Sequence, residues 1–247
     1  EEVERNGYEK GAVLARVAAS HLRVGTFQFF SARGETEKVR QLADYAIARH
    51  YPDIGDRPDR YLEFFRRVRD AQAALVAQWV LVGFVHGVMN TDNTTISGET
   101  IDYGPCAFMD IYDPKAVFSS IDQHGRYAFG NQPPIMQWNL SRFAETLIGL
   151  VNPADSDDAV RQLTNEINAF PAHYQTLWLG GMRAKLGLFT QQPGDPDLAN
   201  DLLTAAQGQG VDYTGLFRAL AELVRGDVAP ARALSIRRAV TNLIDNA

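Results

Sequence analysis

The sequence predicts an α+β fold that is mostly helical. Two long stretches, 35–50 and 62–82, repeat apolar residues at three- and four-residue spacing, which is typical of amphipathic helices. Between them and the later helical sequence, residues 86–108 are rich in β-branched residues, Asn, Asp and Gly, which favours short strands and tight turns. The chain therefore has one strand-and-turn segment set among helices.

The first elements differ in how clearly the pattern defines them. Residues 12–18 are small and apolar with one arginine, which fits either a buried strand or the start of a helix. The amphipathic helix over 35–50 should stop at Pro52, because proline cannot continue the backbone hydrogen-bond ladder. The longer helix over 62–82 should be central and should end at Gly83.

The second half of the chain is predicted to be helical after an irregular loop. Residues 113–134 carry Pro, Gly, Asn and His without periodicity, which is typical of a long functional loop. Helical spacing then returns in six stretches: 138–151, 156–168, 174–188, 197–206, 214–224 and 230–245.

Composition limits the classes of function. The chain has 247 residues, of which 45% are apolar, enough for a sizeable core. Its 24 basic and 30 acidic residues give a net charge of -6, which argues against nucleic acid or an anionic membrane as a partner. The longest apolar run, 73–89, is interrupted by polar residues and glycines and falls short of a membrane span. One cysteine and no signal-like amino terminus favour the cytoplasm.

The strand-and-turn segment holds the candidate chemistry. Asp92, Asn93 and Asp102 offer hard oxygen ligands, and a hairpin pairing 94–96 with 100–102 would bring Asn93 close to Asp102. Mg²⁺ binds through one or two such oxygens and completes its octahedron with water and phosphate. Asp92, beside this pair, could accept a proton from an attacking hydroxyl. The alternative is that these residues only cap turns, as Asn, Asp and Gly commonly do.

Several strings of this chain resemble one known family. HGVMNTDN and IDYGP are followed by FMDIYDP, DQHGRYAFGNQP and WNLSRFAETL, and preceded by ARVAASHLRVGTF and EKVRQLADYAI. In this order they resemble the selenoprotein O family, most strongly over 11–150. Members have a protein-kinase-like fold and bind ATP turned around, so that AMP is transferred to Ser, Thr or Tyr hydroxyls of protein substrates.

The resemblance implies a domain assignment. It identifies residues 1–247 as the C-terminal catalytic lobe of a kinase-like domain, with short β-hairpins at the active site. The family's glycine-rich loop and phosphate-binding lysine, in the N-terminal lobe, and its extreme C-terminal tail are expected outside this sequence. The order of the predicted elements is also that of a kinase C-lobe.

The resemblance also implies roles for individual residues. Asp92 matches the proton acceptor, Asn93 and Asp102 match the ligands of Mg²⁺ or Mn²⁺, and Asp102 begins the DYG that stands where kinases have DFG. Arg16 and Arg23 match the arginines that hold the phosphates of the inverted ATP, or of UTP as a related nucleotide. The competing interpretation of both arginines is an ordinary surface ion pair with Glu or Asp.

Two other functions stay open from the residues. Kinases separate the catalytic Asp from the metal-binding Asn by four residues, whereas Asp92 and Asn93 are adjacent, so a protein kinase would need an atypical catalytic loop. A non-catalytic pseudokinase that binds partners is the second alternative. We interpret His86 as a packed core residue, while His124 and Arg126 are either solvated or in contact with substrate or nucleotide.

Overall fold

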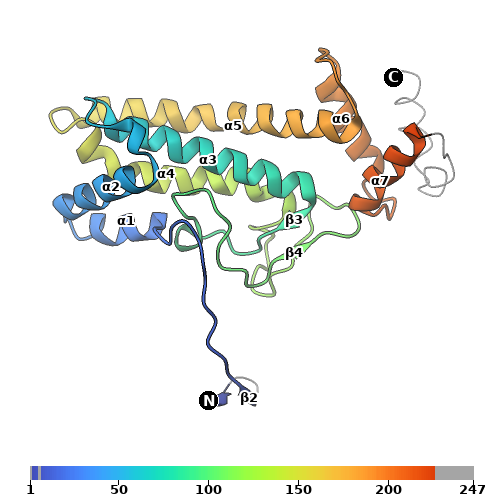
Figure 1. The fold of residues 1–247 in the computed structure, drawn as a ribbon, viewed down its shortest axis with the longest axis horizontal. Helices are drawn as coiled ribbons and strands as arrows, with labels where there is room; N and C mark the ends of the chain where they lie inside the picture. Colours follow the sequence, from blue (N-terminus) through green and yellow to red (C-terminus); the bar gives the residue numbers. More distant parts are fainter. Residues whose placement is uncertain (1, 5–6, 226–247) are drawn as a thin grey trace.

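The computed structural model describes residues 2–4 and 7–225, and helices form most of this part of the chain (Figure 1). The α-helices are α1 (Val24–Ser31), α2 (Thr36–His50), α3 (Arg60–Val82), α4 (Gln132–Val151), α5 (Ser156–Leu186), α6 (Asp195–Ala206) and α7 (Tyr213–Val224). The strands are β1 (Glu2–Glu4), β2 (Tyr8–Lys10), β3 (Phe84–Val85) and β4 (Ala107–Phe108). Three single 3₁₀ turns are η1 (Pro52–Ile54), η2 (Thr91–Asn93) and η3 (Phe129–Asn131). The prediction of a mostly helical α+β chain is confirmed.

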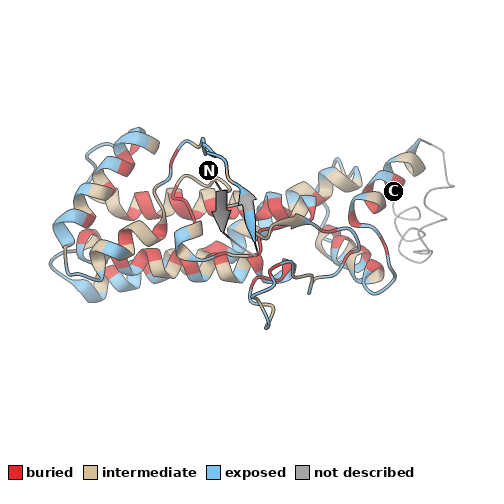
Figure 2. Cartoon of the chain, turned by 90° about the horizontal axis from the view of Figure 1, so that it is seen from below, coloured by how far each residue is buried: buried red, intermediate tan, exposed pale blue. Residues whose placement is uncertain are grey.

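Helices α3, α4 and α5 lie side by side and form the core, with α1 and α2 covering one end (Figure 1). Their buried residues lie largely on the faces that the helices turn toward one another (Figure 2). Aromatic rings pack where α1 contacts α3 and α4. The centroid of the Phe143 ring of α4 lies 5.0 Å from that of Phe27 of α1 and 5.6 Å from that of Phe64 of α3. Edge-to-face pairs of this kind add specific geometry to a large buried apolar area.

The two helices predicted first are confirmed. Helix α2 ends one residue before Tyr51, and Pro52 begins the next 3₁₀ turn. Helix α3 ends at Gly83, which takes a left-handed conformation with φ 74°. A Cβ at this position would lie 2.9 Å from the Tyr213 ring, so both the backbone angle and the space require glycine. No helix within the described ranges is both long and apolar enough to cross a membrane.

Helix α5 corrects the sequence prediction, which divided it into 156–168 and 174–188. The helix runs without a break through Pro171. Proline lacks the N–H that would bond the carbonyl of Ile167, four residues earlier. That carbonyl instead accepts a hydrogen bond from Gln137 Nε2 of α4, at 3.1 Å. A neighbouring helix thus satisfies the group that the proline leaves open, which the sequence pattern of α5 alone does not reveal.

Residues 12–18 are neither the buried strand nor the helix start that the composition suggested. They form an extended arm that leads from β2 to the helices (Figure 1). Val13 and Val17 are 101% and 96% exposed, so apolar composition here does not mean burial. Helices α6 and α7 begin and end within two residues of the prediction. Helix α4 begins at Gln132, six residues before the predicted start, because its two prolines occupy the first turn, where no backbone N–H is needed. The predicted helix 230–245 lies outside the described residues.

The predicted hairpin between 94–96 and 100–102 is wrong. Ile96 N donates to Leu22 O, and Val24 N donates to Thr94 O, both at 3.0 Å, so this backbone pairs with the start of α1 instead. A side chain closes the turn that follows: Thr95 Oγ1 donates to Glu99 O at 2.9 Å and accepts from Glu99 N at 3.1 Å. The short strands are instead β3, just before the segment, and β4, at its end, which pair antiparallel with each other.

Buried amide side chains from the helices hold the irregular segment between β3 and β4. Gln132, the first residue of α4, accepts from His86 N at 3.0 Å and donates to Phe84 O at 2.9 Å. From α3, Gln72 Nε2 donates to Thr95 O at 2.6 Å. Both glutamines are fully buried, where an unpaired backbone group would be costly. They therefore replace the strand ladder that this segment lacks.

Asn139 of α4 performs the same task farther along the segment. Its Nδ2 donates to Met89 O at 3.0 Å and to Thr94 Oγ1 at 2.9 Å. Thr94 Oγ1 in turn donates to Asn90 O at 3.1 Å. The turn η2, which lies between Asn90 and Thr94, is thereby fixed on both sides by one buried residue.

His86 is a packed, hydrogen-bonded core residue, as the sequence suggested. Its side chain is fully buried, its ring lies 5.4 Å from the Trp79 ring, and its Nε2 lies 2.7 Å from Ile101 O. Burial lowers the pKa of His86, because the charged imidazolium is poorly solvated there. The ring is therefore neutral near pH 7.

Replacing Gln132 by alanine should lower the free energy of unfolding by about 2–4 kcal/mol, because two buried backbone groups lose their partners. The matched control is Gln175→Ala, which truncates an exposed glutamine within α5 and should change stability by less than about 0.5 kcal/mol. Urea unfolding measures both. Equal losses in the two variants would contradict the structural role of Gln132.

The free energy of unfolding should fall as the pH is lowered, because His86 is protonated more readily in the unfolded chain. An unfolded histidine binds a proton below about pH 6.5, whereas the buried ring does so only at a lower pH. The unfolded state therefore gains protons first, and stability declines from pH 6.5 downward by at most about 1.4 kcal/mol per pH unit. Urea midpoints at several pH values test this. His86→Gln should flatten the dependence, and the exposed-residue control His21→Gln should not; the same slope in wild type and His86→Gln would refute the assignment.

Candidate functional site

The predicted proton acceptor and one predicted metal ligand lie together on η2, which packs against the first turn of α1. Gly25 permits this close approach: a Cβ there would lie 3.2 Å from both Cα and Cβ of Asp92. The turn is closed by Asn93 N, which donates to Asn90 O at 2.9 Å. Asp92 and Asn93 therefore sit on a short, tightly held turn, although most of the segment around it is irregular.

A chain of hydrogen bonds connects Asn93 to the residue before Asp102. Asn93 Nδ2 donates to Val88 O at 3.0 Å, so the side chain has its amide oxygen left to offer to a cation. Val88 N lies 3.4 Å from His86 Nδ1, and His86 Nε2 lies 2.7 Å from Ile101 O. One buried imidazole thus contacts both the residue that Asn93 bonds and the residue that precedes Asp102.

Asp102 has an unusual backbone conformation. Its φ is +63°, and it is the one non-glycine residue with positive φ in the part of the chain described. Aspartate tolerates this left-handed region better than most residues. The bend is closed by Gly104 N, which donates to Asp102 O at 2.7 Å. Residues held in rare conformations tend to cluster at functional sites.

Arg16 reaches Asp102 from the extended arm. Its Nη1 lies 2.8 Å from Asp102 Oδ1, and the two side chains are 49% and 31% exposed. An ion pair this exposed adds little to folding stability. It does show that the arm carries a guanidinium group to the predicted metal ligand. The competing interpretation of Arg16, an ion pair with an acidic residue, is thus also correct as a description of this structure.

Arg23 is placed differently. It is half-buried, precedes α1, and forms an isolated β-bridge with Thr95. Its backbone N donates to Thr26 Oγ1 at 3.3 Å, while its guanidinium forms no ion pair with any residue in 2–4 or 7–225. The structure therefore brings Arg16 and Asp102 into contact and connects Asn93, through Val88 and His86, to Ile101, the residue before Asp102. It places Arg23 at the neighbouring helix start, without a contact to the other predicted site residues.

The donor set fits a cation that takes most of its ligands from elsewhere. Across the described residues there is no group of three or more His, Cys, Asp or Glu side chains able to hold a metal ion. The predicted ligands Asn93 and Asp102 would supply one amide oxygen and one carboxylate. Mg²⁺ is often bound this sparsely, with water and nucleotide phosphate as its remaining ligands.

Two residues near the site were not singled out from the sequence. Tyr127, from the irregular loop, donates its hydroxyl to Asn90 Oδ1, directly before η2. Asn139 of α4 contacts the residues on both sides of that turn, Met89 and Thr94. A signal existed for Asn139, because it is a polar residue between the buried Met136 and Leu140. Tyr127 lies in a stretch without periodicity and gave none.

Comparison with known proteins gives consistent matches over nearly the whole chain. A family model described as "Protein adenylyltransferase SelO" matches residues 1–245. A "Protein nucleotidyltransferase YdiU" of Cereibacter sphaeroides is 58% identical over 227 residues, which is 92% of this chain and 47% of that protein. The protein with this name in Rhizobium etli is 56% identical over 238 residues, 96% of this chain and 47% of its own length.

A third relative, from Rhizobium rhizogenes and also named "Protein nucleotidyltransferase YdiU", is 59% identical over 213 residues, 86% of this chain and 42% of the relative. The chain spans about half the length of these curated relatives. The family model covers far more than half of the chain, and three relatives exceed 55% identity. The chain therefore belongs to the SelO family.

Proposed function

We propose that this chain is the catalytic C-terminal lobe of a kinase-like protein adenylyltransferase, which transfers AMP from ATP to Ser, Thr or Tyr hydroxyls of proteins. The names of the family model and of the relatives support transfer of a nucleotidyl group to protein. The order of elements supports the kinase-like lobe: a long helix, a segment with short strands, an irregular loop and then a run of helices. UMP transfer from UTP is a related activity of the same site.

The observation that carries the proposal is the contact between Arg16 and Asp102. The first residue is expected to bind phosphate and the second to bind the metal, and their charged groups lie 2.8 Å apart. A nucleotide phosphate bound to a divalent cation needs an arginine and a carboxylate at one place. The contact therefore supports a common binding point for phosphate and metal.

Each residue has a defined task in this proposal. Asn93 and Asp102 hold Mg²⁺ or Mn²⁺, which when bound neutralises charge on the phosphates. The guanidinium groups of Arg16 and Arg23 bond phosphate oxygens, since arginine stays charged and can bond two oxygens at once. Asp92 accepts the proton of the acceptor hydroxyl. The hydroxyl oxygen bonds to the α-phosphorus, and the bond from that phosphorus to pyrophosphate breaks.

The adjacency of Asp92 and Asn93 favours this activity over phosphoryl transfer. In protein kinases four residues separate the catalytic base from the metal-binding Asn. Here both lie in the single turn η2, so the base and the cation are spaced differently from those of a kinase.

Because its one cysteine, Cys106, leaves the chain without an internal disulfide, we place the reaction in the cytoplasm.

Removing the Asp102 carboxylate should weaken binding of nucleotide with Mg²⁺. Asp102→Asn is the informative change, because asparagine tolerates the positive φ while losing the charge. The rise in melting temperature caused by ATP with Mg²⁺ should shrink to less than half, and Asn93→Ala should act in the same direction. Asp201→Ala, on the exposed face of α6, is the control. An Asp102→Asn protein with the full rise would contradict the metal assignment.

Removing the Asp92 carboxylate should slow transfer strongly without loss of nucleotide binding. Asp92→Asn should lower the rate of AMP transfer by about 10²–10⁴-fold, the usual contribution of a general base. Intact-mass measurement of an incubated protein substrate checks this and identifies the adduct. A phosphate adduct would instead show a kinase. A protein that binds ATP with Mg²⁺ but transfers nothing, even as wild type, would show a pseudokinase.

A further inference from the structure

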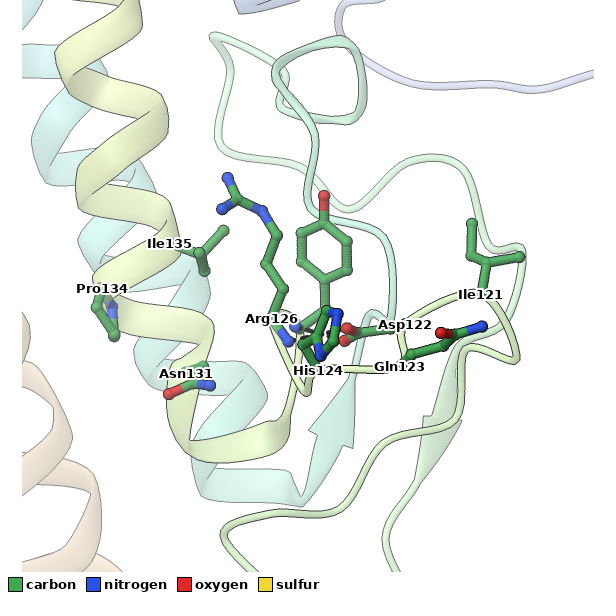
Figure 3. A pocket seen from close by; sticks show the side chains of 9 residues that line it. Ile121, Asp122, Gln123, His124, Arg126, Asn131, Pro134 and Ile135 are labelled. Carbon is green, nitrogen blue, oxygen red and sulfur yellow. Dashed lines mark hydrogen bonds between the residues drawn. The ribbon is translucent and has the colours of Figure 1, made fainter.

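The irregular loop between β4 and α4 forms an open hollow that the proposed chemistry does not use (Figure 3). Its volume is about 770 Å³. Ile121, His124 and Arg126 of the loop line it, together with Pro134 and Ile135 of α4. The loop and the first turns of a core helix thus make opposite sides of one surface.

One side chain links this hollow to the turn η2, which carries Asp92. Tyr127 is among its lining residues, and its hydroxyl donates to Asn90 Oδ1. Asn90 is the residue before η2, and its carbonyl accepts from Asn93 N at 2.9 Å. A molecule seated in the hollow would therefore contact Tyr127, whose hydroxyl is bonded to the residue that precedes η2 and the proposed base Asp92.

Two side chains of opposite charge line the hollow, Arg126 and Asp122, and they differ in what they contact. The Arg126 side chain is exposed and forms no ion pair with any other described residue. Its guanidinium lies 4.8 Å from the Trp138 ring centroid and 5.7 Å from that of Tyr127, which holds it in place by cation–π contact. The nearby carboxylate of Asp122 accepts instead from the backbone N of Arg126 and Tyr127, at 2.9 and 2.7 Å.

Apolar side chains at the rim of the hollow, Ile121 and Pro134, lie on the same surface as the Arg126 guanidinium. Ile121 is 78% exposed, and Pro134 is also exposed. The chain as a whole is acidic, with a net charge of -6, so a positioned cation beside apolar side chains is a local departure from its surface. Arg126 and the rim complement an acidic side chain that is followed or preceded by an apolar one.

From this we infer that the hollow is the acceptor-protein subsite, where Arg126 selects substrate segments that carry Asp or Glu near the modified hydroxyl. The inference rests on the proposed adenylyl transfer and adds its substrate class. Arg126 binds substrate and determines specificity, but it takes no part in the chemical step.

A peptide mixture with one fixed Ser and randomised flanking residues tests the inference. The full-length protein is incubated with ATP, Mg²⁺ and the mixture, and AMP-bearing peptides are sequenced by mass spectrometry. Wild type should enrich Asp and Glu about threefold over Lys and Arg, the change that one exposed ion pair supports. Arg126→Gln should remove this preference, and Arg126→Glu should reverse it. The control Arg218→Glu makes the same charge change on the exposed face of α7 and should retain the preference.

The outcomes separate the inference from the proposed function. Modified peptides without acidic enrichment, or with the same enrichment in Arg126→Glu, would overturn the inference alone. A smaller nucleotide-induced rise in melting temperature in Arg126→Gln would also overturn it, because Arg126 would then bind nucleotide. If wild type places AMP on no peptide and on no protein, the proposed function fails and the inference fails with it.

Discussion

The site depends on buried side-chain amides that satisfy the backbone of an irregular segment. Between β3 and β4 the chain has only one short 3₁₀ turn and one isolated β-bridge, so most of its backbone groups have no partner in a helix or sheet. Gln132 and Asn139 of α4 and Gln72 of α3 supply the missing partners. Because these residues lie on the packed core helices, they hold a non-repetitive backbone in a defined shape. The core helices thus determine where the backbone of the site lies.

His86 extends the same principle to the two predicted metal ligands. A neutral, buried imidazole can contact the segment through both ring nitrogens, one on the Asn93 side and one on the Asp102 side. The charged groups themselves stay nearer solvent, where Arg16 reaches Asp102 from the arm. The site therefore combines a rigid neutral support with exposed charges. This arrangement suits a phosphate-bearing ligand, because charged side chains can exchange partners without disturbing the core.

Sequence reasoning succeeded where local pattern decides structure. The apolar periodicity of α2 and α3 was sufficient to predict both helices, because burial of one face depends on residues within the helix itself. Gly83 likewise predicted the end of α3, because glycine readily takes the left-handed conformation found there. Sequence reasoning failed where distant residues decide. Pro171 does not interrupt α5 because Gln137 of α4 bonds the open carbonyl, and the 94–96 backbone pairs with the start of α1 rather than with its neighbour. Asp92, Asn93 and Asp102 were proposed from residue chemistry as well as from the resemblance, whereas Arg16 and Arg23 came from the resemblance alone. The groups that support them required the fold.

The most direct test is the location of one metal ion. A crystal of the full-length protein with Mn²⁺ and a non-hydrolysable ATP analogue would reveal it through anomalous scattering. The account predicts one Mn²⁺ bound by both the Asn93 amide oxygen and the Asp102 carboxylate, at about 2.0–2.3 Å, with phosphate oxygens completing its shell. An ion bound at neither side chain, or the two side chains turned to separate surfaces, would contradict it.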